Sequence, residues 1–285
     1  MRMRHWTPLF VALVLTGLTL ASCSSGGSGP QAGSPAWYWQ AAEETFASGD
    51  YEKAQQHLKE VADGDSEYKE QAALWRAAIT GGLARGYMEL GNALAEAMEE
   101  DEKLVGSFTV RVQDFRRNAR RHAINFTESI GAVRKIAGQG PTVALRFPFP
   151  TGSANESPTL LSLREGEKVP ESQIDAALDH TLKRGLLLQT AQMAGAGDDV
   201  AKGQALFESG EASVPQLVFL QNLGKSLYEI SALFGSEQLH EPKIQKVMLD
   251  SALQCLQPAL DAEDGELKQQ AMLIKEEIDK GSKAK

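Results

Sequence analysis

The sequence predicts an all-α fold, and three observations support that prediction. After residue 36, apolar residues recur three or four positions apart through most of the chain, which places them on one face of a helix. Glycine-containing breaks such as Gly49-Asp50 and Gly195-Ala196-Gly197 separate these periodic stretches. Only residues 141–168 depart from the pattern, because four prolines exclude helix from most of that stretch. We therefore expect packed helical hairpins with one extended, proline-containing arm.

Composition limits the class of protein and of partner. A hydrophobic content of 42% in 285 residues is ordinary for a globular chain with a real core. The formal net charge is −9, and loss of Arg2 and Arg4 with an export signal would make the mature chain more acidic still. Such a chain is a poor candidate for binding nucleic acid. Its two cysteines are Cys23 and Cys255, so if Cys23 is modified no disulfide can form within the chain.

The N-terminus has the layout of an export signal. Residues 1–5 are basic, and Leu9 to Leu20 form an apolar run that is too short to span a membrane. The run ends in Leu-Ala-Ser before Cys23, an order that resembles the lipobox of bacterial lipoproteins. The resemblance implies cleavage after Ser22 and attachment of diacylglycerol, with palmitate-like chains, to the cysteine sulfur. The alternative is an ordinary secretory signal with a cysteine near its cleavage site.

The resemblance also indicates a location. Ser24 stands where the family's inner-membrane retention signal has aspartate, which implies the outer membrane facing the periplasm. We therefore divide the chain into a signal peptide (1–22), a lipidated Ser/Gly linker (23–35), N-terminal helices (36–140), the arm (141–168) and C-terminal helices (169–281). More than one acyl chain is needed for stable anchoring, as the family's lipidation provides.

Residues 36–97 suggest helical pairs. Tyr38, Ala42 and Thr45 share one helical face, Gly49-Asp50 interrupts it, and Ala54 and Leu58 continue the pattern. An opening aromatic, the Gly-Asp-Tyr turn and the Ala54/Leu58 pair resemble a degenerate tetratricopeptide repeat, although its terminal proline is absent. The resemblance implies an irregular helical solenoid with a groove for peptides or partner helices. Residues 74–97 form either a second such pair or one long bent helix.

A long amphipathic helix is expected at 108–137, ended by Gly138. Four arginines, Arg116, Arg117, Arg120 and Arg121, lie off its apolar face. They either pair with the chain's own acids, such as the run 99–102, or form a surface for an anionic partner, because arginine's planar fork suits phosphate and carboxylate oxygens.

The arm combines prolines with a period of two. Val143, Leu145, Phe147 and Phe149 alternate with other residues, so one side of an extended segment is apolar. We expect Phe147 and Phe149 to fix the arm to the helical body. The arm is interpreted either as a structural strap or as a lid over a binding site.

Helices return after Pro170. A helix should run to Gly195, and Gly203, Phe207 and Pro215 then stand at the repeat-like spacing of a second helix and its terminal proline. The segment 267–278 should form an amphipathic helix that closes the array.

No catalytic residue, metal ligand set or cofactor is predicted. The histidines of the mature chain, His57, His122, His180 and His240, lack metal-ligand spacing, and no nucleophile elbow or phosphate loop occurs. We interpret Asp175, Asp179 and His180 as a solvated helix face.

The predicted function is a membrane-tethered scaffold that binds partner proteins through its helices. The alternative is a small-ligand-binding accessory protein of an envelope transport system, and a cell-wall hydrolase has the least support. An enclosed apolar cavity under the arm would favour the ligand binder, whereas an open groove would favour the scaffold. Converging carboxylates in a cleft would favour the enzyme.

Overall fold

The structure, a computed structural model, describes residues 29–167, 169–236, 238–263 and 265–283. Within these ranges helices pack on one another and the only sheet has two short strands, so the all-α prediction is confirmed. Cys23 and the predicted signal peptide lie outside the described residues. None of the described helices is long and apolar enough to cross a bilayer.

The chain begins with a helical hairpin. Helix α1 (Pro35–Ala47) starts at Ser34, whose side chain accepts a hydrogen bond from the backbone N–H of Trp37. Gly49 takes a left-handed conformation (φ +82°) in the turn, and Asp50 caps helix α2 (Tyr51–Asp63) in the same way as Ser34 caps α1. The expected break and both expected helices are therefore present.

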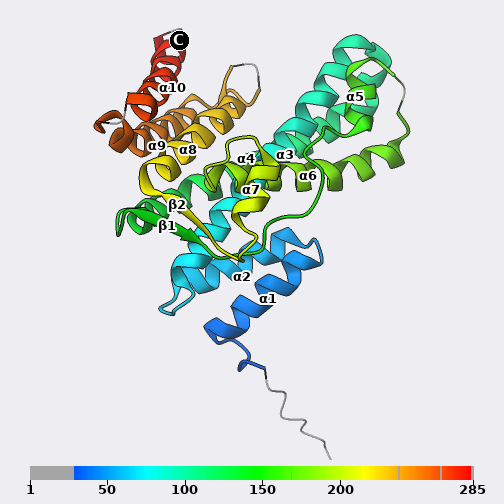
Figure 1. The fold of residues 1–285 in the computed structure, drawn as a ribbon. Helices are drawn as coiled ribbons and strands as arrows, with labels where there is room; N and C mark the ends of the chain where they lie inside the picture. The colour runs from blue at the N-terminus through cyan, green and yellow to red at the C-terminus, as the bar shows by residue number, and fades with distance from the viewer. Residues whose placement is uncertain (1–28, 168, 237, 264, 284–285) are drawn as a thin grey trace, which may run out of the picture.

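Two long helices form the centre of the molecule. Helix α3 (Lys69–Glu100) is followed by a short 3-10 turn, η1 (Glu102–Leu104), and by α4 (Val105–Ala137), which runs back along α3 (Figure 1). Residues 74–97 thus belong to one continuous helix rather than to a second hairpin. Helix α4 ends at Gly138, as its sequence predicts.

The glycines of α3 permit a close helix crossing instead of breaking the helix. Helix α6 (Glu171–Met193) crosses α3 where Gly185 faces Gly82 and Gly86. A Cβ atom on Gly185 would lie 2.3 Å from the Gly82 carbonyl oxygen and 2.9 Å from the Gly86 nitrogen. Only hydrogen at Cα allows the two backbones to approach this closely.

The arm contains more regular structure than its sequence predicts. Strand β1 (Thr142–Leu145) pairs antiparallel with β2 (Ala212–Pro215), with Thr142 opposite Pro215. Pro215 therefore ends a strand before helix α8 and does not end a repeat. Residues 158–164 also form a helix, α5 (Pro158–Arg164), because proline is tolerated in a first turn and Leu160 and Leu163 become buried.

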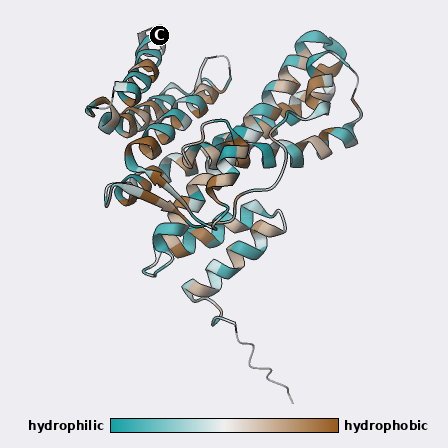
Figure 2. Cartoon of the chain, in the orientation of Figure 1, coloured by the Kyte–Doolittle hydropathy of each residue, from teal (hydrophilic) through white to brown (hydrophobic). Residues whose placement is uncertain are grey.

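The C-terminal part adds α7 (Val200–Leu206), α8 (Gln216–Ser231), the turn η2 (Ala232–Phe234), α9 (Pro242–Leu260) and α10 (Gly265–Lys283). Figure 1 shows α8–α10 stacked on one side of the molecule. The C-terminal end of α3 and the N-terminal end of α4 lie with α5 on the other side of the molecule, and α1 and α2 lie below. Hydrophobic and hydrophilic residues are interspersed along these helices (Figure 2).

Two apolar cores correspond to this arrangement. The larger includes α1–α3, the second half of α4 and α8–α10, and the smaller joins the second half of α3 to the first half of α4, α5 and α6. Cys255 lies in the larger core, where burial raises the pKa of its thiol to about 12. A thiol with such a pKa is an unreactive core side chain.

Candidate functional site

The arm is fixed to the helical body by an aromatic stack. Phe147 is 4% exposed, and its ring lies parallel to that of Trp75, with centroids 6.0 Å apart. The ring of Phe207, which follows α7, is tilted against that of Phe147, with their centroids 5.7 Å apart. Phe149 is only half-buried, and the centroid of its ring lies 5.3 Å from that of Phe207. The space beneath the arm is thus filled by aromatic rings from α3 and from the segment after α7.

A side chain of α3 also binds the backbone of the arm. Gln71 Nε2 donates to the carbonyl oxygen of Ala144 at 2.9 Å, and Gln71 Oε1 accepts from the backbone N–H of Arg146 at 2.8 Å. These two bonds replace the ladder bonds that a third strand would provide on that edge of β1. The arm is therefore anchored by both its apolar rings and its main chain.

An open groove lies where the arm passes between the N-terminal hairpin and α6. It encloses about 440 Å³ and is lined by Glu43, Phe46, Ala47, Ser48, Gly49, Tyr51, Pro148, Phe149, Thr151, Asp179 and Lys183. The hairpin turn, the arm and α6 are far apart in sequence and each contributes part of the wall. We call this site the arm groove.

The arm groove combines aromatic surface with charged groups. Tyr51 and Phe149 are half-buried, and Lys183 Nζ lies 2.8 Å from Asp179 Oδ2 at the edge. Burial raises the pKa of the Tyr51 phenol above its ordinary value, while nearby Lys183 and Asp179 act in opposite directions on it. The phenol stays neutral at physiological pH and can both donate and accept hydrogen bonds.

The four arginines of the predicted anionic surface lie on α4 as expected, but three of them contact acids of this chain. Arg120 forms two hydrogen bonds, at 2.7 and 3.0 Å, to the carboxylate of Glu241 just before α9. Arg117 binds Asp114, and Arg121 binds Glu52. These contacts favour pairing within the chain, although none of them involves the acidic run 99–102.

Arg116 differs from the other three. Among the described residues it has no carboxylate partner, and its buried Nε atom has no hydrogen-bond acceptor. Binding of an anionic partner at Arg116, Arg117, Arg120 and Arg121 stays a prediction. An anion at this surface would compete with the carboxylates that already pair with Arg117, Arg120 and Arg121.

The carboxylate bound by Arg121 also holds a buried histidine. His122 is fully buried on α4, its Nε2 lies 3.0 Å from Glu52 Oε1, and its ring stacks on Tyr87. The hydrogen bond with His122 lowers the pKa of Glu52, against the opposing effect of burial and with help from the charge of Arg121. This cluster joins α2 to α4 through Nε2 of the ring, while His122 Nδ1 is buried without a hydrogen-bond partner.

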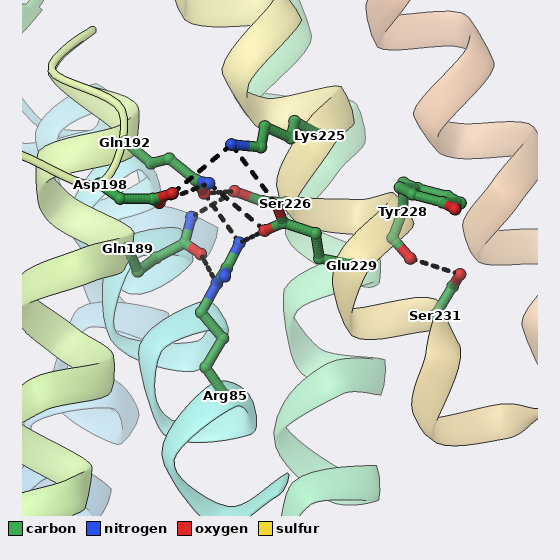
Figure 3. A network of polar contacts seen from close by, with 9 residues as sticks. All are labelled: Arg85, Gln189, Gln192, Asp198, Lys225, Ser226, Tyr228, Glu229 and Ser231. Atoms are coloured by element: carbon green, nitrogen blue, oxygen red, sulfur yellow. Dashed lines mark hydrogen bonds and ion pairs between the residues drawn. The ribbon is translucent and has the colours of Figure 1, made fainter. Parts of the chain in front are cut away.

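A polar network joins α3, α6 and α8 in the interior (Figure 3). Arg85 donates to Gln189 Oε1 at 3.0 Å and to Gln192 Oε1 at 2.8 Å, and it also binds Glu229. Ser226, fully buried, bridges the two glutamines. Since each member has a partner, the network stabilises one arrangement of the three helices.

The charge of Glu229 depends on this network. Burial alone would raise the pKa of Glu229, but the positive charge and hydrogen bond of Arg85, with Lys225 and Gln192, lower it below the ordinary value overall. A lowered pKa means that the ionised carboxylate stabilises the fold at neutral pH. This contribution is lost as pH falls through the folded-state pKa, below the reference value of 4.5.

We therefore expect Glu229→Gln to reduce stability at pH 7 and to have a smaller effect in acid. The free energy of unfolding, measured by urea denaturation for both proteins between pH 7 and pH 3, should show a difference that shrinks below about pH 4.5. A difference that stays constant over this range would show that the charge of Glu229 does not stabilise the fold.

Sequence reasoning did not identify this network. Arg85 stands beside Gly86 within residues 74–97, for which the sequence allows either a second helical pair or one long helix. Gln189 and Gln192 follow the apolar run Leu186–Leu188 and fall on the buried side of α6. Polar residues at buried helical positions are a signal that could have identified them, but the identity of their partners requires the tertiary structure.

The structure does not bring catalytic groups together at the helix face considered in the sequence. Asp175 pairs with Arg111 at 2.9 Å and Asp179 with Lys183, and both aspartates are exposed. Within the described ranges, no group of three or more histidine, cysteine, aspartate or glutamate side chains could hold a metal ion.

Comparisons with known proteins add no assignment. No protein-family model, no curated protein and no solved structure matches this chain.

Proposed function

We propose that this protein is a membrane-tethered lipoprotein of the bacterial envelope and acts as a protein-interaction or assembly scaffold. The observation that carries the proposal is the arm groove. It is open to solvent, it is lined by both aromatic and charged side chains, and three separate segments build its walls. A polypeptide segment of a partner protein fits such a surface, since exposed aromatic side chains combine apolar contact with hydrogen bonding.

The tether and the groove support the same role. The Leu-Ala-Ser-Cys sequence and the Ser/Gly linker resemble a lipoprotein N-terminus, and Ser24 favours the outer membrane. A helical body held near the bilayer on a flexible linker can present one binding surface to proteins in the periplasm.

The ligand-binding alternative has less support from the arm. A small-ligand accessory protein would need a cavity under the arm, but the rings of Trp75, Phe147 and Phe207 occupy that space. The arm therefore resembles a strap that shapes the edge of a groove more than a lid over a ligand.

Site-specific photocrosslinking in intact envelopes tests the scaffold role. A benzoylphenylalanine at Ser48, which is exposed in the arm groove, should yield a discrete protein adduct. The same group at Val247, which is 56% exposed on α9 and outside the groove, is the matched control. The Ser48 adduct should weaken when Lys183→Glu reverses the charge at the groove edge. Equal adducts from both positions, or none from Ser48, would contradict the proposal.

Membrane attachment should depend on Cys23. The Cys23→Ser variant lacks the sulfur that would carry diacylglycerol, so it should lose labelling by radioactive palmitate and leave the membrane fraction. The control is Cys255→Ser, because Cys255 is buried and should not accept lipid. If the Cys23→Ser variant is labelled as strongly as the wild type, the lipoprotein assignment is wrong.

A further inference from the structure

A second groove lies between the first part of α3 and the last part of α4, with the end of α2 beside it. It encloses about 270 Å³ and shares no lining residue with the arm groove. Its apolar lining consists of Ala62, Ala73, Ala132 and Ile136. Because alanine ends at Cβ, three of these side chains leave the space of the groove unfilled. We call this site the α3–α4 groove.

Ionisable side chains of both signs also line the α3–α4 groove. The bases are Lys69, Arg76 and Lys135, and the acids are Asp63, Glu70 and Glu128. Across the part of the chain that the structure describes, none of these side chains forms an ion pair or a side-chain hydrogen bond. In the arm groove, by contrast, Lys183 already pairs with Asp179. The α3–α4 groove therefore offers unpaired partners to a ligand that carries both charges.

Arg76 is the least exposed of these charged residues. It is half-buried, and its guanidinium group has no hydrogen-bond acceptor within the described ranges. Its nitrogen atoms are not enclosed, since the enclosed side-chain atoms without partners belong to other residues. A ligand in the groove can therefore reach the guanidinium group. The planar fork of arginine binds both oxygens of a carboxylate, so a carboxylate is the ligand group that suits Arg76.

The spacing of the charges indicates the length of the ligand. Glu70 precedes Arg76 by six residues on α3, which corresponds to about 9 Å along the helix axis. Asp63 ends α2 and lies toward the Glu70 end, because only residues 64–68 connect α2 to α3. An extended chain spans at most about 3.3–3.6 Å per residue, so three residues reach from these acids to the guanidinium group.

The other charged residues of the groove do not block such a ligand. Lys69, Lys135 and Glu128 are exposed, and none of them is bound to Arg76 or to the two acids. Their long side chains can turn into solvent when a ligand enters, whereas the half-buried Arg76 is held at the groove. Arg76 therefore fixes the orientation of the ligand, with its carboxylate at this end.

We propose that the α3–α4 groove binds a tripeptide with free termini and small side chains. The C-terminal carboxylate of the peptide pairs with Arg76, and its N-terminal ammonium group lies near Asp63 and Glu70. The small side chains contact the alanines between these two ends. This site adds recognition of a short peptide to the scaffold role, and it depends on neither the membrane anchor nor the arm groove.

The test uses trialanine with free termini as the probe. Saturation-transfer NMR should show binding to the wild-type protein with a Kd on the order of a millimolar, as expected for so small a ligand. Trialanine with an acetylated N-terminus and an amidated C-terminus lacks both charges, so it should bind at least about tenfold more weakly. Free alanine has both charges but cannot span the groove, and it should also bind at least about tenfold more weakly.

Two variants locate the site in the α3–α4 groove. Arg76→Met removes the charge but keeps an unbranched side chain, and it should weaken binding of trialanine about tenfold. Ala132→Leu fills the groove from an exposed position on α4 and should weaken binding at least about tenfold. The matched control is Ala176→Leu, the same change at an exposed alanine of α6 outside the groove, which should leave binding unchanged.

Absence of binding to the wild type would overturn the proposal, as would equal binding of capped trialanine or of free alanine. Binding that Arg76→Met or Ala132→Leu leaves unchanged would overturn it as well. The comparisons among peptides use the wild-type protein, so they do not depend on the folding of any variant. All of these results leave the crosslinking test of the arm groove unaffected.

Discussion

Phe147→Ala should reduce the free energy of unfolding by about 3–5 kcal/mol, the usual cost of truncating a buried aromatic side chain. The ring is 4% exposed and fills the space between Trp75 and Phe207, so its removal leaves a cavity between α3, the arm and the segment after α7. Urea denaturation followed by circular dichroism measures the change. For a domain of this size, the melting temperature should fall by roughly 2–4 °C for each kcal/mol lost.

Phe149→Ala is the matched control on the same arm. Its ring is half-buried and lines the arm groove, so truncation should cost only about 1–2 kcal/mol while weakening the Ser48 crosslink. Equal stability losses for the two variants would show that both rings are core residues. If Phe147→Ala leaves stability unchanged, the arm does not depend on this aromatic stack.

Gly185→Ala should destabilise the protein by about 3 kcal/mol, at the upper end of overpacking effects. The new methyl group would lie 2.3 Å from the Gly82 carbonyl oxygen, which belongs to helix backbone and cannot rotate away. Helices α3 and α6 would have to separate, which would disturb the hydrogen bonds from Arg85 to Gln189 and Gln192. Thermal and urea denaturation should both detect the loss.

A second glycine of a long helix provides the control. Gly131 lies within α4, is exposed, and has no atom within 4 Å of the position that a Cβ would occupy. Gly131→Ala should therefore stabilise the protein by about 0.5–1 kcal/mol, because alanine loses less conformational entropy than glycine in a helix. If Gly185→Ala has the same stabilising effect, the close crossing of α3 and α6 is wrong.

The local elements of the fold could be predicted from local patterns. The 3.6-residue spacing of apolar side chains predicts α1, α2 and α4, and Asp50 and Gly138 mark two of their boundaries. The alternation of Val143, Leu145 and Phe147 predicts an extended segment with one buried side, and all three are buried. Both kinds of periodicity result from backbone geometry within a few residues, so neighbouring sequence is sufficient to predict them.

Other features depend on residues that are distant in sequence. A Gly-rich stretch is compatible with a helix break or with a close crossing of two helices. Only the tertiary structure, which places Gly185 opposite Gly82 and Gly86 of the continuous helix α3, distinguishes the two. Strand β2 exists because β1 lies beside it, since four residues cannot form a stable strand without a partner.

The candidate sites show the same division. The sequence by itself determined that Cys23 follows a lipobox-like segment, that Phe147 lies on an apolar side and that the four arginines lie off the apolar face of α4. Only the tertiary structure decided that Arg120 meets Glu241, that Arg85 meets Glu229, and which side chains line each pocket. Charge pairing and pocket shape arise from helices that pack across more than a hundred residues of sequence. A local pattern carries no information about which distant residue will lie opposite.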